Sequence, residues 1–170
     1  MSNHSSNQTS IGTKLVQAVQ KEAAMNRPLP LQAEAQDGAV KASVIVADND
    51  RLSHLAGEVK VSVSGGASKA ASPKAKAEAF AGRTTYLTER LGYVETDAGG
   101  TAVLRSTPET MRGKKSEYYE ARVGDSEMSL KRYKPHAQKG GRDAVPFHVT
   151  DDTLARIADD GAAALTTRKK

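Results

Sequence analysis

The sequence predicts an α+β fold, in which an antiparallel meander sheet of about five to seven strands is packed by two helices. Two observations concern the helices: a helix-forming run begins at Ser72 and Pro73, and a second amphipathic stretch begins after Thr150. Between them, apolar and polar residues alternate over several short runs separated by glycine-containing turns. Such alternation is typical of an antiparallel sheet with one buried and one exposed face.

The first predicted helix spans residues 73–91. Ser72 is suited to cap its first turn, and Pro73 is favoured at the first helical position because that position needs no backbone N–H partner. The apolar stripe then follows at helical spacing and consists of Phe80, Thr84, Leu87 and Leu91. Gly92 stands where a left-handed cap is expected to end the helix.

The alternating runs that predict strands are residues 93–96, 101–105, 116–123, 128–134 and 145–149. Gly99 and Gly100 supply the positive φ of a tight turn, so the first two runs are expected to form a hairpin. A turn at 124–127 joins the next two runs into a second hairpin. Pro146 places the last run at a sheet edge or a strand start, because proline has no N–H for the ladder.

The closing helix is predicted to begin after Thr150, whose hydroxyl is suited to cap it. Asp151 and Asp152 place negative charge in its first turn, where the helix dipole favours it. Its apolar stripe consists of Leu154, Ile157, Ala158 and Leu165. We expect this helix and the one that begins at Pro73 to cover the buried face of the sheet.

Two further strands are predicted before the first helix. Residues 40–46 and 58–64 alternate, and we expect both to join the same sheet because an isolated pair of strands is marginally stable. Residues 48–57 place two leucines at a spacing that predicts one or two helical turns. Residues 65–71 consist of Gly, Ser, Ala and Lys, which predicts a flexible linker.

The predicted organisation is a single domain over residues 37–166, after a flexible segment over 1–36 and before a frayed basic tail at 167–170. Residues 1–9 are rich in Ser, Asn and Gln and predict disorder. Residues 10–24 predict a short amphipathic helix. Its apolar positions are Ile11, Leu15, Val16 and Val19. Two interpretations compete, a helix packed on the domain and a docking helix for a partner, and we favour the first.

Composition limits the classes of function. The chain of 170 residues has a net charge of +5 and no cysteine. Without cysteine there is no disulfide framework, no thiolate zinc site and no cysteine nucleophile. The N-terminal residues lack the features of a secretory signal, and no apolar run is long enough to span a bilayer. We therefore expect a cytoplasmic protein that does not contact membranes.

A basic cluster with an interleaved tyrosine is the candidate binding site. No acidic residue interrupts the stretch between Glu127 and Asp143. The candidate residues are Lys131, Arg132, Tyr133, Lys134, His136, Lys139 and Arg142. Lys131 and Tyr133 are expected on one face of the second hairpin, and cations beside aromatic rings can grip phosphates and stack on bases. The competing interpretation is a solvated basic surface in which the tyrosines pack.

Catalytic, metal and cofactor motifs are absent from the sequence. Neither a Gly-x-Ser-x-Gly elbow nor a phosphate loop is present, and the four histidines share no metal-ligand spacing. We interpret His54 and His148 as structural. The sequence therefore predicts no enzymatic activity, no bound metal and no cofactor.

The leading prediction is a small cytosolic binding or scaffolding module whose partner is an unknown protein. The sheet edges and the amphipathic segment at 10–24 are its expected contact surfaces. The alternative is a binder of nucleic acid or another polyanion, acting through the basic cluster. Cations gathered on one exposed face would favour the alternative, whereas their neutralisation by acidic residues would favour the module.

Overall fold

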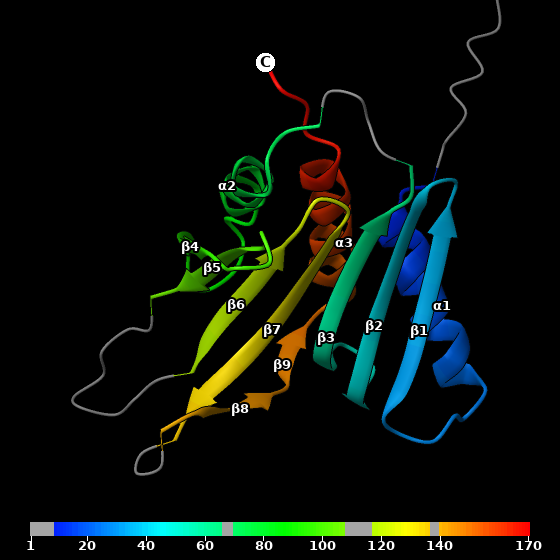
Figure 1. Ribbon diagram of the computed structural model, residues 1–170. Helices are drawn as coiled ribbons and strands as arrows, with labels where there is room; N and C mark the ends of the chain where they lie inside the picture. Colours follow the sequence, from blue (N-terminus) through cyan, green and yellow to red (C-terminus); the bar gives the residue numbers. More distant parts are fainter. Residues whose placement is uncertain (1–8, 66–69, 108–116, 137–139) are drawn as a thin grey trace, which may run out of the picture.

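The computed structural model describes residues 9–65, 70–107, 117–136 and 140–170. In these ranges, three helices and a nine-stranded antiparallel sheet form an α+β fold (Figure 1). The predicted fold class is therefore confirmed, with more strands than expected and with the helix predicted at 10–24 beside the two that were expected to pack the sheet. No helix of the described residues is long and apolar enough to cross a membrane.

The helices are α1 (Ile11–Ala24), α2 (Pro73–Arg83) and α3 (Asp151–Leu165). The strands are β1 (Leu31–Asp37), β2 (Val40–Asn49), β3 (His54–Val63), β4 (Leu91–Thr96), β5 (Ala102–Ser106), β6 (Tyr118–Val123), β7 (Glu127–Pro135), β8 (Arg142–Val145) and β9 (Phe147–Val149). Their order in the sheet is β1-β2-β3-β7-β6-β5-β4, with β8 paired to β7 and β9 paired to β3. The two early strands do join the central sheet, as predicted.

The strands β3 and β7 diverge, and the segment formed by β8 and β9 occupies the gap between them (Figure 1). Residues 59–62 of β3 pair with residues 127–130 of β7. Beyond these pairs, β3 pairs with β9 and β7 pairs with β8. Pro146 separates β8 from β9, so the single strand predicted over 145–149 is wrong, although Pro146 does stand at a strand start, just before β9.

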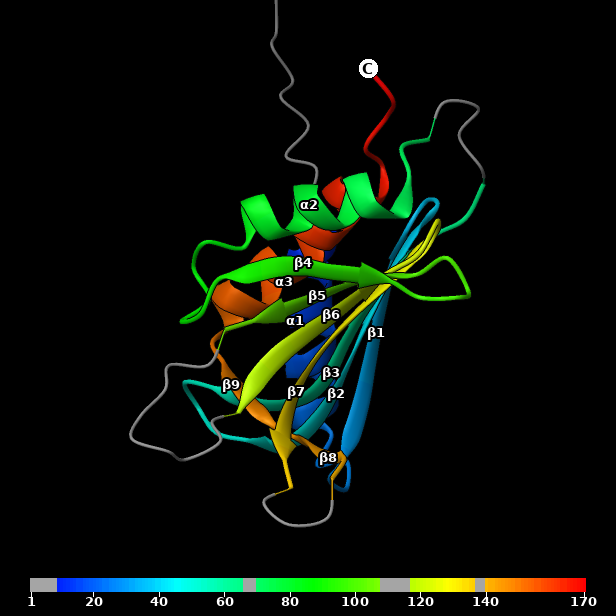
Figure 2. The same ribbon diagram turned by 60° about the vertical axis from the view of Figure 1, so that its left-hand side comes forward.

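All three helices lie on the same side of the sheet (Figures 1 and 2). The side chains that face them are fully buried and come from alternate positions of several strands, for example Val44, Val61, Leu104, Ala121 and Leu130. No described helix covers the opposite face. The alternation of the sequence thus separates a buried face from an open face, as expected for such a sheet.

The helix α1 is packed on the domain, which confirms the favoured interpretation of residues 10–24. Its apolar side chains Ile11, Leu15, Val16 and Val19 are buried in the core. The following strand β1 pairs with β2 along its whole length. The structure thus differs from the predicted flexible segment over 1–36. The sequence of β1, LQAEAQD, does alternate, but two of its three inward apolar residues are alanines, so its apolar pattern is weak.

The helix predicted over residues 73–91 ends early, at Arg83. Thr84 is its C-cap residue, with a ψ of 47° that departs from the helical value, and both its backbone N–H and its hydroxyl donate to the Phe80 carbonyl oxygen, each at 3.1 Å. Leu87 and Leu91 are buried as predicted, but from a loop and from β4. Spacing therefore identified the buried side chains correctly and the secondary structure wrongly.

The helical turns predicted over residues 48–57 are also wrong. The strand β2 continues to Asn49, and the chain then turns around Asp50. The Asp50 carboxylate accepts hydrogen bonds from the backbone N–H groups of Leu52 at 2.7 Å and Ser53 at 2.8 Å. These hydrogen bonds lower the pKa of the Asp50 carboxyl group, and the one from Leu52 has the larger effect. The strand β3 then begins at His54.

His54 connects three elements beneath the sheet. Its Nε2 lies 2.6 Å from Asp151 Oδ1 at the start of α3, and its Nδ1 contacts Asn49 Oδ1. Gln20 of α1 donates to the other oxygen of Asp151 at 3.2 Å. His54 is buried and satisfied, which confirms its interpretation as a structural residue. His148 is exposed, so the same interpretation is wrong for that residue.

Several predictions about flexible segments fall on residues that the structure does not describe. The predicted disorder at 1–9 and the predicted linker at 65–71 lie largely outside the described residues. The basic tail is described, and it is not frayed at its start. The Ala71 N–H donates to the Thr167 carbonyl oxygen at 3.1 Å, and Ala70 pairs with Arg168 in a β-bridge.

The contact between α1 and α3 depends on a glycine. The Gly12 N–H donates to Asp159 Oδ1 at 2.7 Å, and a Cβ atom at this position would lie 2.0 Å from the Ala155 carbonyl oxygen. Gly82 of α2 is the matched control, because a Cβ there would meet nothing within 4 Å.

We predict that Gly12→Ala lowers the free energy of unfolding by about 2 kcal/mol or more, because the two helices must move apart. Gly82→Ala should raise it by about 0.5–1 kcal/mol, because alanine loses less entropy in a helix. Urea denaturation of the two variants and the wild type measures both changes. An unchanged stability of Gly12→Ala would contradict this helix contact.

Candidate binding surface on the open sheet face

The open face of the sheet carries three of the seven residues of the sequence-predicted basic cluster, Lys131, Tyr133 and Arg142. A shallow depression of about 200 Å³ lies on it, and its lining consists of Glu58, Lys60, Glu120, Arg122, Glu127, Ser129, Lys131 and Tyr133. Lys131 and Tyr133 thus project from the same face, as predicted. Acidic and basic side chains alternate across this lining, so the charge pattern is mixed.

Glu120 of β6 is the most buried acid on this face, with 1% of its side chain exposed. Arg105 Nε donates to one of its oxygens at 2.8 Å, and Arg142 donates to both oxygens at 2.5 and 3.0 Å. Burial raises the pKa of Glu120, but the hydrogen bonds from Arg142 and Arg105 outweigh it, and the net pKa is lowered. Glu120 is therefore a charged carboxylate held between cations.

Arg142 of β8 is fixed on three sides. In addition to Glu120, its Nη1 donates to the Tyr118 hydroxyl at 2.9 Å. Its guanidinium carbon lies 3.7 Å from the centre of the Tyr133 ring, within range of a cation–π contact. The hydrogen bond to Glu120 is the main cause that raises the pKa of Arg142. Two members of the predicted cluster, Tyr133 and Arg142, are therefore in contact, but Arg142 is paired with the carboxylate of Glu120.

Lys131 is also paired with an acid. Its Nζ lies 2.9 Å from Glu58 Oε2, and the hydrogen bond between them raises the pKa of Lys131. Lys60 lies 3.3 Å from the other oxygen of Glu58. Glu58 comes just before the paired residues of β3, and Lys131 comes just after the paired residues of β7. Their ion pair therefore lies where the two strands diverge.

Arg132 points to the helix side of the sheet. Its Nε lies 3.0 Å from Glu117, its Nη2 lies 3.2 Å from Glu89, and its guanidinium covers the Tyr119 ring at 4.5 Å. Burial lowers the pKa of Arg132, but the hydrogen bond to Glu117 and the charge of Glu89 outweigh it and raise the pKa. The cluster is therefore divided between the two faces.

The remaining members of the cluster are peripheral. Lys134 is exposed, and His136 Nε2 lies 3.2 Å from Asp143 Oδ1. Lys139 lies outside the described residues. The sequence could not reveal the acidic partners Glu58, Glu89, Glu117 and Glu120, because they are distant from the cluster residues in the chain. Neutralisation of the cations is the arrangement that favours a protein-binding module over a polyanion binder.

The edge strand β1 is a second feature of this face, which the sequence analysis placed in a flexible segment. Its seven residues pair with β2 in unbroken register, from Leu31 opposite Val46 to Asp37 opposite Val40. In such a hairpin, alternate residues direct their backbone groups away from the partner strand. In β1 these residues are Gln32, Glu34 and Gln36. No described backbone group outside the β1–β2 ladder pairs with them.

Several large exposed apolar side chains belong to the segments next to the start of β1. Met25 is 52% exposed and Leu29 is 49% exposed, and both lie in the connection from α1 to β1. Ile45, 41% exposed, is the register partner of Gln32. Leu52, 84% exposed, lies in the turn that follows β2. The sequence signal that could have indicated this surface is the presence of Met25 and Leu29 in a connection that is otherwise polar or proline.

No family model, curated protein or solved structure matches this chain. Among the described residues, no group of three or more His, Asp or Glu side chains could hold a metal ion. His148 lines only a small depression of about 120 Å³, together with the turn around Asp50. The geometry of the open face and of the β1 edge is therefore the basis for inferring a function.

We predict that Glu120→Gln lowers the free energy of unfolding by about 2 kcal/mol, because the partly exposed Arg105 and Arg142 lose the charged hydrogen-bond acceptor that they share. Glu127→Gln, an exposed carboxylate on the same face, should change it by less than about 0.5 kcal/mol. Urea denaturation at pH 7 measures both changes. Equal effects of the two substitutions would contradict the role given to Glu120.

The same site predicts a dependence on pH. Because the pKa of Glu120 is lower in the folded state, its stabilising contribution is present above the ordinary value of 4.5 and is lost as the pH falls through the folded-state pKa. Denaturation curves between pH 7 and pH 3 should therefore show a shallower acid loss for Glu120→Gln than for the wild type. Parallel curves would contradict this assignment.

Proposed function

We propose that the chain is a small, non-catalytic binding module of the cytoplasm, and that an extended segment of a partner protein adds as a strand to β1. The observation that carries this proposal is the unpaired backbone of Gln32, Glu34 and Gln36 along an edge without a bulge. An added strand satisfies these groups with main-chain hydrogen bonds, the mode by which many domains bind extended peptides.

The edge strand β1 lacks most of the devices that shield an ordinary edge. Natural sheets shield their edges with charged side chains, above all lysine, and with proline, bulges or very short strands. The strand β1 contains neither lysine nor proline, its register with β2 is regular, and its two charged residues, Glu34 and Asp37, are paired with Lys41 and Lys14. The opposite edge, β4, carries a bulge between Tyr93 and Glu95. A binding role for β1 explains why this edge is left regular.

The apolar side chains near β1 support the same proposal. Leu29 precedes the strand, and Ile45 lies on the open face beside Gln32. Exposed apolar area at one place marks interaction sites, because its burial on binding is favourable. A partner strand with apolar residues at alternate positions has the chemistry that fits this edge.

The ion pairs of the open face favour a protein partner over a polyanion. Phosphate groups would have to compete with Glu58 for Lys131 and with Glu120 for Arg142. The cost of that exchange is high for Glu120, which would lose its counter-charges while almost fully buried. The cytoplasmic location is proposed from the sequence, which contains no cysteine.

The test uses peptides selected on the wild-type chain from a random display library. We predict that Glu34→Pro weakens their binding about tenfold or more, because proline removes an outward N–H group and blocks the added strand. Glu34→Ala is the matched control: it loses the same side chain and its ion pair with Lys41, but keeps the N–H group. It should bind with nearly wild-type affinity.

Both variants should remain folded, since proline is tolerated on an edge where its nitrogen faces solvent. Circular dichroism checks this point. Peptides that bind Glu34→Pro as well as the wild type would overturn the proposal. Light scattering of the free protein separates a second copy of the chain from a foreign partner, because only a second copy would make the wild type dimeric and Glu34→Pro monomeric.

A further inference from the structure

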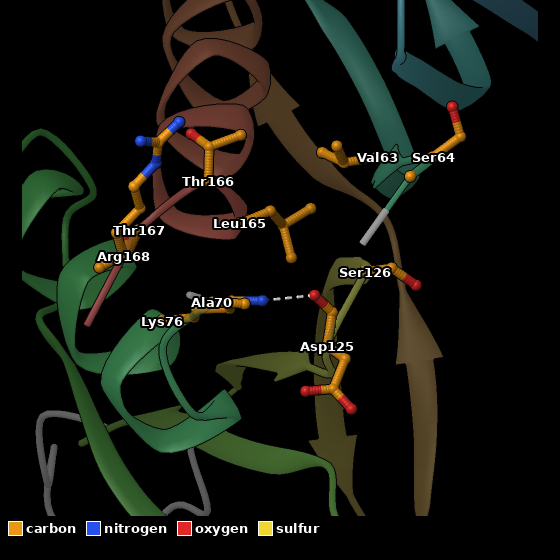
Figure 3. Close-up of a pocket in the computed structure, with 11 residues that line it drawn as sticks. Val63, Ser64, Ala70, Lys76, Asp125, Ser126, Leu165, Thr166, Thr167 and Arg168 are labelled. Carbon is orange, nitrogen blue, oxygen red and sulfur yellow. Dashed lines mark hydrogen bonds between the residues drawn. The ribbon is translucent and has the colours of Figure 1, made fainter. Parts of the chain in front are cut away.

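A cavity of about 660 Å³ lies where the end of β3, the helix α2 and the end of α3 meet (Figure 3). Its lining consists of Val63, Ser64, Gly65, Ala70, Lys76, Asp125, Ser126, Leu165, Thr166, Thr167 and Arg168. Its volume is within the range of small-molecule sites, about 300–1,000 Å³. It is separate from the β1 edge, so it bears on a property other than the proposed function.

Lys76 is the unusual residue of this cavity. It is 1% exposed, and its Nζ donates to the backbone carbonyl oxygen of Asp125 at 2.5 Å. No carboxylate of the described residues forms an ion pair with it, and the Asp125 carboxylate points away from the ammonium group (Figure 3). Lysine is almost never fully buried unless it is paired. An ammonium group also has three donors, of which this hydrogen bond uses one.

The surrounding helices do not supply the missing charge. Lys76 lies near the N-terminus of α2, where the helix dipole disfavours a cation. The C-terminal end of α3 reaches the cavity at Leu165, but a helix end carries only a partial negative charge. A buried charge without a counter-charge is costly to the fold. Negative charge brought by a bound molecule would remove that cost.

The walls of the cavity indicate the kind of anion. Val63 and Leu165 present apolar surface near the ammonium group of Lys76 (Figure 3). Arg168, the other cation of the lining, is exposed, and its guanidinium points away from Lys76 (Figure 3). The one buried cation, Lys76, is matched by one negative charge, which favours a carboxylate over a dianionic phosphate. We propose that this cavity binds a small organic acid, whose carboxylate accepts a hydrogen bond from Lys76 and whose hydrocarbon part packs against Val63 and Leu165.

The direct test is an NMR titration of the intact chain with hexanoate. Its neutral analogue hexanamide and inorganic phosphate serve as comparison probes. Hexanoate should give saturable shifts of the backbone amides of Lys76, Ser126 and Thr167. Hexanamide and phosphate should each bind at least about tenfold more weakly than hexanoate, because binding requires both the negative charge and the apolar contact. The absence of saturable shifts, or equal binding of hexanamide, would overturn the proposal.

Two lysines of α2 provide the matched variants. Lys76→Met should weaken hexanoate binding about tenfold or more, and should raise the melting temperature of the free protein because an unpaired buried charge is removed. Lys74→Met makes the same change at an exposed position of the same helix and should leave hexanoate binding unchanged. Wild-type affinity in Lys76→Met would overturn the proposal.

A second variant tests the cavity without changing a buried residue. Ser126 lines the cavity from the exposed turn between β6 and β7. Ser126→Asp adds a negative charge to the lining of the cavity, which repels the carboxylate of the probe, so hexanoate should bind several-fold more weakly. This variant carries the test if Lys76→Met does not fold. Unchanged affinity for hexanoate in Ser126→Asp would count against the site.

Discussion

The burial of one face of the sheet beneath three helices is the constraint on which the rest of the structure depends. Alternate strand positions, such as Val44, Val61 and Leu130, must be apolar to fill the space below α1 and α3. The close approach of α1 to α3 at Gly12 shows how little room is left there. Because all the helices lie on one side, every other strand position faces outward, and the chemistry of the open face follows from this division.

On the open face, ion pairs connect the strands around the place where β3 and β7 diverge. The Glu58–Lys131 pair lies at the point where β3 and β7 separate. Glu120 receives Arg142 from β8 and Arg105 from β5, and so links strands on both sides of β6 and β7. Partly buried pairs of this kind add little net stability, but removal of one partner is costly. They fix the arrangement of the strands in the middle of the sheet, away from the β1 edge.

Local features of the sequence predicted much of the fold. The caps of α2 and α3 were correctly placed, because the hydroxyl groups of Ser72 and Thr150 accept the N–H groups that each helix start leaves unpaired. Both hairpins of the meander were predicted from alternation and turn residues. The end of α2 was missed because Leu87 and Leu91 are buried at helical spacing without being helical. The strand β1 was missed because its inward residues are mostly alanine.

The sites depend on contacts that a linear pattern does not contain. Lys131 and Arg142 formed a basic cluster in the sequence, but their acidic partners come from β3 and β6 and became visible only in three dimensions. Lys76 lies in a helix whose other lysine is exposed, and its burial results from the approach of α3 and the turn after β6. The sequence therefore showed where basic residues are concentrated, and only the fold showed which of them are paired with acidic residues.

The open edge of β1 is tested most directly by amide hydrogen exchange along β1 in the free protein at low concentration. We expect fast exchange for Gln32, Glu34 and Gln36, whose N–H groups point away from β2, and slow exchange for Ala33 and Ala35, which pair with it. Slow exchange at all five positions would contradict an open edge, because it would mean that another strand already covers β1.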